Sequence, residues 1–393
     1  MAASLMAEGS VVIGPRGIDR LRLGHLWVYR SDIRSAKAGP GDIVRLTDER
    51  GRFQGWAFYS DKSQIAIRLL TRHDVSIDRA YFAERIRNAA AYRKVVVENT
   101  DAFRLVYGES DHLPSFVVDR YGDYLVMQTL SQSTERLKDL FVQILVELLA
   151  PKGILERNDP RVRLLEGLEE RVGVLHGEVP EEIIARENGI AFRYDLRHGQ
   201  KTGSFLDQRE NHQAARRYAS GDVLDCFSYQ GGFALTVAST CEHVEATDMA
   251  PATIQAARQN QQLNAISNIT FREGNSFDIL KEYDEAGRQF DMVILDPPAF
   301  AKNRDSVPAA VRGYKEINLR ALKLLKRGGF LLTCSCSYHI SEALFLQTLA
   351  EAANDARRAV VVADRRTQAQ DHPIILTMPE THYLKCIIVR ALE

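Results

Sequence analysis

Strand-like and helical segments alternate from about residue 191 to the end of the chain, and this alternation constrains the fold most. The apolar runs VLDCF, HVEATD, ITFREG, MVILD and GFLLTCS read as strands, and segments such as PATIQAARQNQQLN and INLRALKLLK between them read as helices. Strands that regularly alternate with helices pair in parallel, with helices on both faces of the sheet. The sequence therefore predicts an α/β fold with a doubly wound, Rossmann-like sheet over residues 191–393.

The chain has 393 residues, which is too long for one hydrophobic core, so further domains are expected. Residues 1–75 contain short β segments separated by turn residues and predict a small β-barrel domain. Residues 76–190 predict an α+β domain, with a helix over 77–98 and hairpin turns at 120–123 and 188–189. A second helix over 133–150 is expected to begin at a cap near Ser133 and Thr134.

Composition narrows the class of protein. No stretch approaches 18 uninterrupted apolar residues, so no membrane span is expected, and the start MAASLMAEGSVVIG does not resemble a signal peptide. The five cysteines are few and odd in number, which favours a reducing cytoplasm over a disulfide framework. A net charge of −1 gives no global attraction to nucleic acid but allows a local basic face.

The first strand of the predicted sheet ends in a turn that is typical of a nucleoside pocket. Asp225 and Gly231 lie around this turn, and Asp248 ends the second strand, where an acid can accept both ribose hydroxyls. The turn Cys226–Gly232 lacks the G-x-G-x-x-G spacing that a pyrophosphate requires. This favours S-adenosylmethionine over a dinucleotide. After the third strand, a polar side chain of 275–278 is expected to read the adenine, and Phe277 to stack on it or to pack in the core.

The fourth strand is followed by Asp296-Pro297-Pro298-Ala299-Phe300. The prolines stop the strand and hold a carboxylate at the sheet edge. Nucleic-acid methyltransferases use a turn of this kind to hydrogen-bond a flipped base. Asp296, Pro297, Pro298 and Phe300 are thus candidate contacts of a target base.

The fifth strand ends in LLTCSCSYHI, which places Cys334 and Cys336 at the same edge. Neither C-x₂-C metal spacing nor a second ligand cluster is present, so no metal site is predicted. Carbon 5 of a pyrimidine is a weak nucleophile, and a thiolate that adds to C6 activates it. Strand alternation predicts both thiols on one side of the sheet, so periodicity does not choose between them.

The chain resembles the large-subunit ribosomal-RNA cytosine-C5 methyltransferase family. The matching stretches include GPRGIDRLRLGHLWVYRSDI, LVYGESDHLPSFVVDRYGDYLVMQ, GQKTGSFLDQRENH, LDCFSYQGGFAL, DPPAF and TCSCS. The resemblance implies a PUA-like RNA-binding domain, a central α+β domain and a class I methyltransferase domain, with ribosomal RNA as the partner. It implies Asp296 at the base and a motif cysteine as nucleophile. The candidate cofactor contacts are Lys201, Asp207, Gln208, Arg209, Asp225, Phe227, Ser228, Tyr229, Gly231, Asp248, Met249, Asn275, Ser276, Phe277 and Asp296.

Several alternatives stay open at this point. The usual Thr/Ser-Cys-Ser/Asn pattern favours Cys334 as nucleophile, and an exchange of roles with Cys336 is not excluded. Because Ala299 stands where related enzymes carry a second cysteine, a different group must promote product release. Methylation of an exocyclic amino group and a catalytically silent RNA-binding assembly factor are the rival functions. The modified nucleotide and a homodimer are left undetermined.

Overall fold

The computed structural model describes residues 9–392, so the first eight residues of the start segment lie outside the description. The described chain forms two compact units. The N-terminal unit consists of residues up to 185 with 194–206 and 370–381, and the C-terminal unit of 186–193, 207–369 and 382 onward. The predicted division into three domains stays a prediction.

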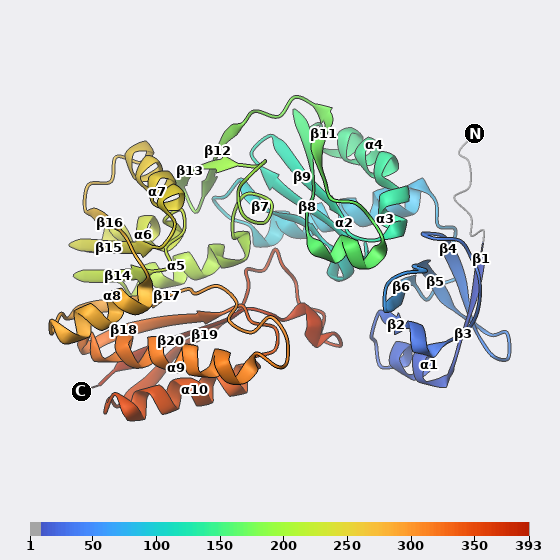
Figure 1. Cartoon of the computed structure of the whole chain (residues 1–393). Helices are drawn as coiled ribbons and strands as arrows, with labels where there is room; N and C mark the ends of the chain where they lie inside the picture. Colours follow the sequence, from blue (N-terminus) through green and yellow to red (C-terminus); the bar gives the residue numbers. More distant parts are fainter. Residues whose placement is uncertain (1–8, 393) are drawn as a thin grey trace. The chain divides into compact units, whose positions relative to one another are not determined.

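The first sheet of the N-terminal unit has six strands in the order β2-β6-β5-β4-β1-β3 (Figure 1). β1 pairs with β4 in parallel and with β3 in antiparallel orientation. Val11, Leu46 and Ile67 are buried within this sheet's core. The bounds are β1 (Gly9–Ile13), α1 (Pro15–Arg22), β2 (Trp27–Tyr29), β3 (Ile33–Lys37), β4 (Ile43–Asp48), β5 (Phe53–Tyr59) and β6 (Ile65–Thr71).

A second sheet follows, with five strands in the order β11-β10-β9-β8-β7. A two-stranded hairpin, β12-β13, comes next, and its residues 186–193 belong to the C-terminal unit. The predicted helix 77–98 and both hairpin turns are confirmed, and the hairpin turn at Asn188 and Gly189 has positive φ at both residues. The bounds are α2 (Arg79–Val96), β7 (Ala102–Tyr107), β8 (Phe116–Tyr121), β9 (Tyr124–Thr129), α3 (Gln132–Arg136), α4 (Lys138–Leu149), β10 (Gly153–Asn158), β11 (Arg171–Gly177), β12 (Glu182–Glu187) and β13 (Ile190–Asp195).

The structure differs in two respects from the predicted helix over 133–150. Its cap is Ser131, whose side chain accepts from the Thr134 N–H while the Thr134 hydroxyl accepts from the Ser131 N–H. The expected cap near Ser133 and Thr134 is therefore wrong, since Thr134 is the reciprocal partner three residues on. The helix is also interrupted at Leu137, which separates α3 from α4.

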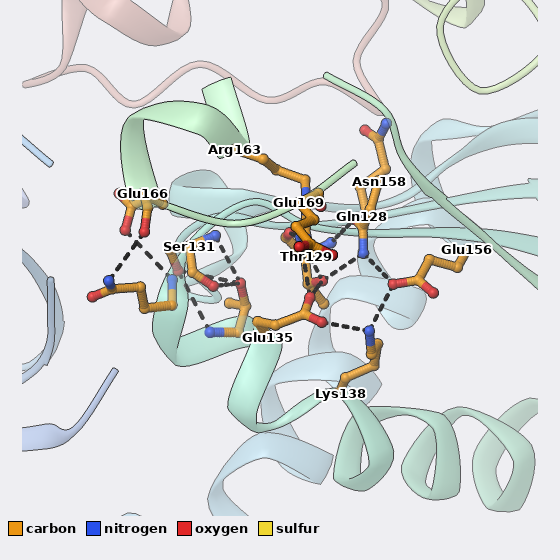
Figure 2. Close-up of polar contacts among 12 residues, drawn as sticks. Gln128, Thr129, Ser131, Glu135, Lys138, Glu156, Asn158, Arg163, Glu166 and Glu169 are labelled. Carbon is orange, nitrogen blue, oxygen red and sulfur yellow. Dashed lines mark hydrogen bonds and ion pairs between the residues drawn. The ribbon is translucent and has the colours of Figure 1, made fainter. Parts of the chain in front are cut away.

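A buried polar network holds α3, α4, β9 and β10 together (Figure 2). Glu135 accepts from the Thr129 hydroxyl at 2.6 Å, from Arg163 at 3.0 Å and from Lys138 at 2.6 Å. The Lys138 ammonium also donates to Glu156 at 2.7 Å. These cationic donors lower the pKa of Glu135 to about 2, although partial burial opposes the shift. Each buried charge thus has a partner of opposite sign.

The C-terminal unit contains the predicted sheet, with seven strands in the order β16-β15-β14-β17-β18-β20-β19. The first five strands in this order are parallel, and β20 runs antiparallel to both its neighbours. The strands are β14 (Asp222–Cys226), β15 (His243–Asp248), β16 (Ile269–Glu273), β17 (Phe290–Leu295), β18 (Leu325–Ser335), β19 (Val360–Arg366) and β20 (Lys385–Ala391). The α/β class and the doubly wound topology are confirmed.

Six helices lie along this sheet, and α9 packs beside both α8 and α10 while α5 packs beside α6 (Figure 1). Leu224, Val293, Leu331 and Tyr314 are buried in the core between sheet and helices. Among residues 9–392, no helix is long and apolar enough to cross a membrane. The helices are α5 (Arg209–Tyr218), α6 (Gly232–Val237), α7 (Pro251–Leu263), α8 (Ser276–Glu285), α9 (Val307–Lys323) and α10 (Glu342–Asp355).

Candidate active site

The candidate site lies at the carboxyl ends of four neighbouring strands. Cys226 of β14 pairs with Thr247 of β15 and with Leu295 of β17, and Leu295 pairs with Thr333 of β18. Asp248, Asp296 and Cys334 each come directly after one of these paired residues. Ligands of doubly wound sheets bind at this edge, near the point where the strand order reverses.

The loop after β14 adopts backbone conformations that the sequence did not reveal. Phe227 and Tyr229 have φ of 65° and 48°, which L side chains rarely adopt. Hydrogen bonds hold the loop there: the Ser228 N–H donates to the Thr247 carbonyl at 2.9 Å and the Tyr229 N–H to Asp248 Oδ2 at 3.0 Å. Left-handed non-glycine residues are enriched at ligand-binding sites because neighbouring contacts must enforce them. Gly231, with φ of 87°, takes this conformation without strain.

Asp225 carries an acceptor that is ready for a ligand. Its carboxylate is fully buried, and Oδ2 accepts from the Ala234 N–H at 3.0 Å. Oδ1 has no hydrogen-bond partner within the described chain, and neither has the buried Ser228 hydroxyl oxygen. Burial, with the charges of Asp296 and Asp248, raises the pKa of Asp225 well above its usual range. A buried acceptor without a donor costs free energy, and the amino and hydroxyl groups of S-adenosylmethionine would supply donors.

Asp248 and the start of α8 form the neighbouring wall. Asp248 Oδ1 accepts from the Ala250 N–H at 3.0 Å and from the Thr253 hydroxyl at 2.9 Å. The Asn275 side-chain oxygen caps α8 by accepting from the Phe277 N–H at 2.9 Å. A contact of Asn275 with adenine would therefore use its NH₂ group, which is a donor. The Phe277 ring lies 5.9 Å from the Phe300 ring, so both aromatic candidates share one side of the site.

Asp296 is anchored by the segment that precedes α5. Gln208 Nε2 donates to Asp296 Oδ1 at 2.8 Å, which brings this predicted cofactor residue to the carboxylate. Asp207 Oδ2 accepts from the Tyr383 hydroxyl at 2.5 Å. The neighbouring Arg209 is buried and pairs with Glu210 at 3.1 Å. Of these three residues, Gln208 is therefore the one in direct contact with Asp296.

Two serines of the TCSCS segment tie it to the DPPAF turn. The Ser337 hydroxyl accepts from the Ala301 N–H at 3.0 Å, directly after Phe300. The Tyr314 hydroxyl, from α9, lies 3.0 Å from both the Ser335 and the Ser337 hydroxyl oxygens. Sequence reasoning missed Tyr314 and both serines, because their role depends on contacts between segments far apart in the chain.

The two motif cysteines occupy different environments. Cys334 is fully buried and lies opposite Cys386 of β20. Burial, with the neighbouring Cys386 and Asp296, raises the pKa of the Cys334 thiol well above its usual range. Cys336 is half-buried, and its Sγ lies 4.0 Å from the Pro297 carbonyl oxygen. β18 ends at Ser335, so Cys336 belongs to the following turn and strand alternation does not extend to it. The expectation that both thiols lie on one side of the sheet stays a prediction.

Comparison with known proteins identifies the family. A PUA-like domain matches residues 11–72, and the S-adenosylmethionine-dependent methyltransferase family matches residues 169–375. The chain is 41% identical over 379 residues to ribosomal RNA large subunit methyltransferase I of Tolumonas auensis, covering 94% of this chain and 96% of that protein. It is 40% identical over 377 residues to the protein of the same name from Aeromonas salmonicida, covering 93% and 95%. The chain belongs to the ribosomal RNA large subunit methyltransferase I family.

Solved structures show the same fold at lower identity. A methyltransferase complexed with SAH is 21% identical, with a TM-score of 0.84 over 97% of this chain and 99% of that chain. An S-adenosylmethionine-dependent methyltransferase from Streptococcus mutans is 20% identical, with a TM-score of 0.81 over the same shares. Membership in the ribosomal RNA large subunit methyltransferase I family confirms the predicted resemblance, enzyme class and cofactor, and the fold likeness extends to the full chain.

Two of the predicted cofactor residues of this family member, Lys201 and Met249, are exposed. Lys201 belongs to the N-terminal unit, is exposed, and places its Nζ 4.5 Å from the centre of the Phe205 ring. The Met249 side chain is 70% exposed. Contacts of Lys201 and Met249 with the cofactor stay predictions. Within residues 9–392, no group of three or more His, Cys, Asp or Glu side chains is arranged to hold a metal ion.

Proposed function

We propose that the protein methylates carbon 5 of a cytosine in large-subunit ribosomal RNA, with S-adenosylmethionine as methyl donor. The names of its relatives support the RNA substrate, and the PUA-like domain supplies a second RNA-contacting module. The observation that carries the C5 chemistry is the half-buried Cys336 thiol beside the Asp-Pro-Pro turn, 4.0 Å from the Pro297 carbonyl oxygen. Methylation of an amino nitrogen requires no thiol at this position.

The residues of the site divide the binding task between them. Asp225, Ser228 and Gly231 would hold the amino-acid part of S-adenosylmethionine, Asp248 its ribose, and the start of α8 its adenine. When bound, this group supplies an electrophilic methyl. The left-handed backbone of the loop and the unpartnered oxygens of Asp225 and Ser228 support the assignment, because strained backbone and preplaced acceptors are typical of ligand sites.

The chemistry assigned to this chain's residues begins at a cysteine. Its thiolate forms a bond to C6 of the cytosine, and the electrons of the C5–C6 double bond make C5 nucleophilic. Asp296, acting as an acid, donates a hydrogen bond to N3 of the base, where negative charge develops. Pro297, Pro298 and Phe300 line the base. After methyl transfer, a base removes the C5 proton, the C5–C6 double bond re-forms, and the thiolate leaves with its electron pair.

We assign the nucleophile to Cys336 in place of Cys334. Only a thiolate attacks, and thiolates form at positions where water and cations can reach the sulfur. Cys334 is buried between strands with its pKa raised, so it forms a thiolate poorly. Cys336 is accessible and lies beside the turn that carries Asp296. We therefore propose Cys336, the alternative that the sequence left open, and not Cys334, which the motif favoured.

The test uses the covalent adduct that the C6 bond would form. RNA containing 5-fluorocytosine lacks the C5 proton, so a C5 methyltransferase stays attached to it. Cys336→Ala is expected to lose both methyl transfer and the adduct but to keep S-adenosylmethionine binding by calorimetry. Cys334→Ala, the matched control two residues away in the chain, is expected to retain the adduct.

Two outcomes would reject parts of this proposal. An adduct that survives Cys336→Ala and disappears in Cys334→Ala would return the role to Cys334. Full methyl transfer by the double alanine variant would instead favour an exocyclic amino group as acceptor. Mapping methylated cytosines in large-subunit ribosomal RNA, with and without the enzyme, identifies the nucleotide.

A further inference from the structure

A buried lysine lies beside the cysteine turn, and neither the sequence motifs nor the family descriptions single it out. Lys385 is the first residue of β20 and pairs with Ser335, the last residue of β18. Its side chain is buried, at 3% exposure for the residue. Lysine is rarely buried unless a specific arrangement compensates the cost of removing its charge from water.

The polar contacts of Lys385 suit an uncharged amine. Nζ donates to the Ser337 carbonyl at 2.7 Å and to the Tyr383 carbonyl at 2.9 Å. Both acceptors are neutral backbone groups, and no carboxylate pairs with Lys385 within residues 9–392. A neutral amine has two N–H donors and one lone pair, so two carbonyls satisfy its donors and the lone pair remains to accept a proton.

The amine lies close to Cys336 in the chain's turn, because Nζ contacts the carbonyl of Ser337, the next residue. Burial lowers the pKa of Lys385 to about 8, and the negative charges of a Cys336 thiolate and of Glu342 oppose the shift. Glu342, at the start of α10, forms an ion pair with Arg365. Other ionisable groups near this turn are Asp296, next to Pro297, and Asp207, which accepts from the Tyr383 hydroxyl. Tyr314 is a further one, because its hydroxyl lies 3.0 Å from the hydroxyl oxygens of Ser335 and Ser337. Lys385, whose Nζ contacts the Ser337 carbonyl, is placed to balance a thiolate in the turn 335–337 when it is protonated.

We propose that Lys385 activates Cys336 by accepting the thiol proton on Nζ and then stabilising the thiolate as an ammonium ion. This inference rests on the proposed role of Cys336 as nucleophile. The S–H bond breaks, its electron pair stays on sulfur, and the proton becomes the third N–H of Lys385. When the S–C6 bond breaks at the end of the reaction, sulfur regains its electron pair, and the ammonium can return the proton. Since Lys385 is then already protonated, a different base removes the C5 proton.

In the reactive state, Cys336 and Lys385 share one proton between them, and this determines how the reaction rate is expected to depend on pH. Reactive thiolate appears as the fully protonated pair loses its first proton. Without the neighbouring cation, the same thiolate must form beside Asp296 and Glu342, which disfavour it. Removing the amine is therefore expected to shift thiolate formation to higher pH.

The experiment measures alkylation of Cys336 by iodoacetamide in the full-length protein without RNA, from about pH 6 to about pH 10. Peptide mass spectrometry follows the modified residue, and Cys336→Ala provides the background. Lys385→Met is expected to raise the pH of half-maximal rate by about one unit or more, which is a loss of about tenfold at neutral pH. Lys385→Arg carries a permanent cation that cannot accept the proton but still stabilises a thiolate, so its pH of half-maximal rate is expected to lie at or below that of the wild type. Lys323→Met, an exposed lysine of α9, is the matched control.

Clear results would overturn the proposal. An unchanged pH profile in Lys385→Met would exclude activation by Lys385, and an equal shift in Lys385→Arg would assign it to packing. S-adenosylmethionine binding, measured by calorimetry, shows whether each variant is folded. If Lys385→Met does not fold, Lys385→Gln replaces it, because its amide retains donors for both carbonyls. Because no RNA is present, the outcome is independent of the fluorocytosine adduct. A wild type that shows the lysine-dependent profile but forms no adduct would reject the proposed function alone.

Discussion

At the scale of single residues, burial decides which members of a motif can react. The sequence motif favoured Cys334, but Cys334 is enclosed between two strands and Cys336 lies beyond a strand end. Asp225 and Asp296 were both recognisable as acids after strands. Only the structure shows that Asp225 is fully buried with one oxygen lacking a partner, whereas Asp296 accepts from Gln208.

Asp225→Asn tests the cost of that buried carboxylate. The variant keeps an oxygen acceptor for the Ala234 N–H and removes a charge that burial, Asp296 and Asp248 disfavour. Because the folded-state pKa is raised, the stabilising effect of the substitution grows as pH rises above the ordinary carboxyl range. We expect the free energy of unfolding at pH 7 to increase by about 1 kcal/mol, with weaker S-adenosylmethionine binding. Urea unfolding and calorimetry measure the two effects, and a destabilised variant would contradict this account.

At the scale of elements, the sequence pattern predicted which segments form strands and helices better than where they end. The break at Leu137 and the end of β18 at Ser335 follow from tertiary contacts. Helix packing also limits which side chains a position can hold, and composition does not reveal this limit. A Cβ on Gly232, at the start of α6, would lie 2.5 Å from the His212 ring of α5, which is buried and hydrogen-bonded to Glu187.

Gly232→Ala is accordingly expected to separate α5 from α6. Overpacking against a fixed ring costs about 1–3 kcal/mol of the free energy of unfolding. The loop before α6 should shift with the helix and weaken cofactor binding. Thermal unfolding and calorimetry provide the readout. Gly173→Ala in β11 is the control, since nothing lies within 4 Å of a Cβ at that position.

Glu135→Gln tests the buried network around α3 and α4. The pKa of Glu135 is lowered to about 2, below the ordinary value of 4.5, so ionised Glu135 stabilises the fold above about pH 4.5. That contribution is lost as the pH falls toward about 2. The variant should therefore be less stable than wild type at pH 7, with a difference that shrinks at about pH 3. Urea midpoints at both pH values check this, and an equal difference at both would contradict it.

At the scale of the whole molecule, the chain contributes non-contiguous segments to each compact unit. Residues 370–381 follow most of the methyltransferase sequence but belong to the N-terminal unit. Asp371 is fully buried there: its Oδ2 accepts from the Arg104 N–H at 2.9 Å, and its carbonyl accepts from Arg93 at 2.8 Å. An assignment of residues 191–393 to one domain, read along the sequence, could not show that residues 370–381 belong to the N-terminal unit.

Asp371→Ala is expected to destabilise the N-terminal unit. It leaves the partly buried Arg104 N–H without its acceptor, which costs about 1 kcal/mol. S-adenosylmethionine binding, which we assign to residues of the C-terminal unit, should persist at temperatures where the N-terminal unit has begun to unfold. Hydrogen exchange resolved by peptide measures the two units separately. Equal loss of protection in both would show that they unfold as one.

The sequence by itself determined the strand and helix alternation, the α/β class, the family motifs and the acids at strand ends. These are local signals, since periodicity and Asp-Pro-Pro or glycine turns act within a few residues. Tertiary structure decided which thiol is accessible, placed Lys385 beside Cys336, and imposed left-handed φ on Phe227 and Tyr229. Those properties arise from contacts between segments distant in the chain, and no local pattern of residues specifies them.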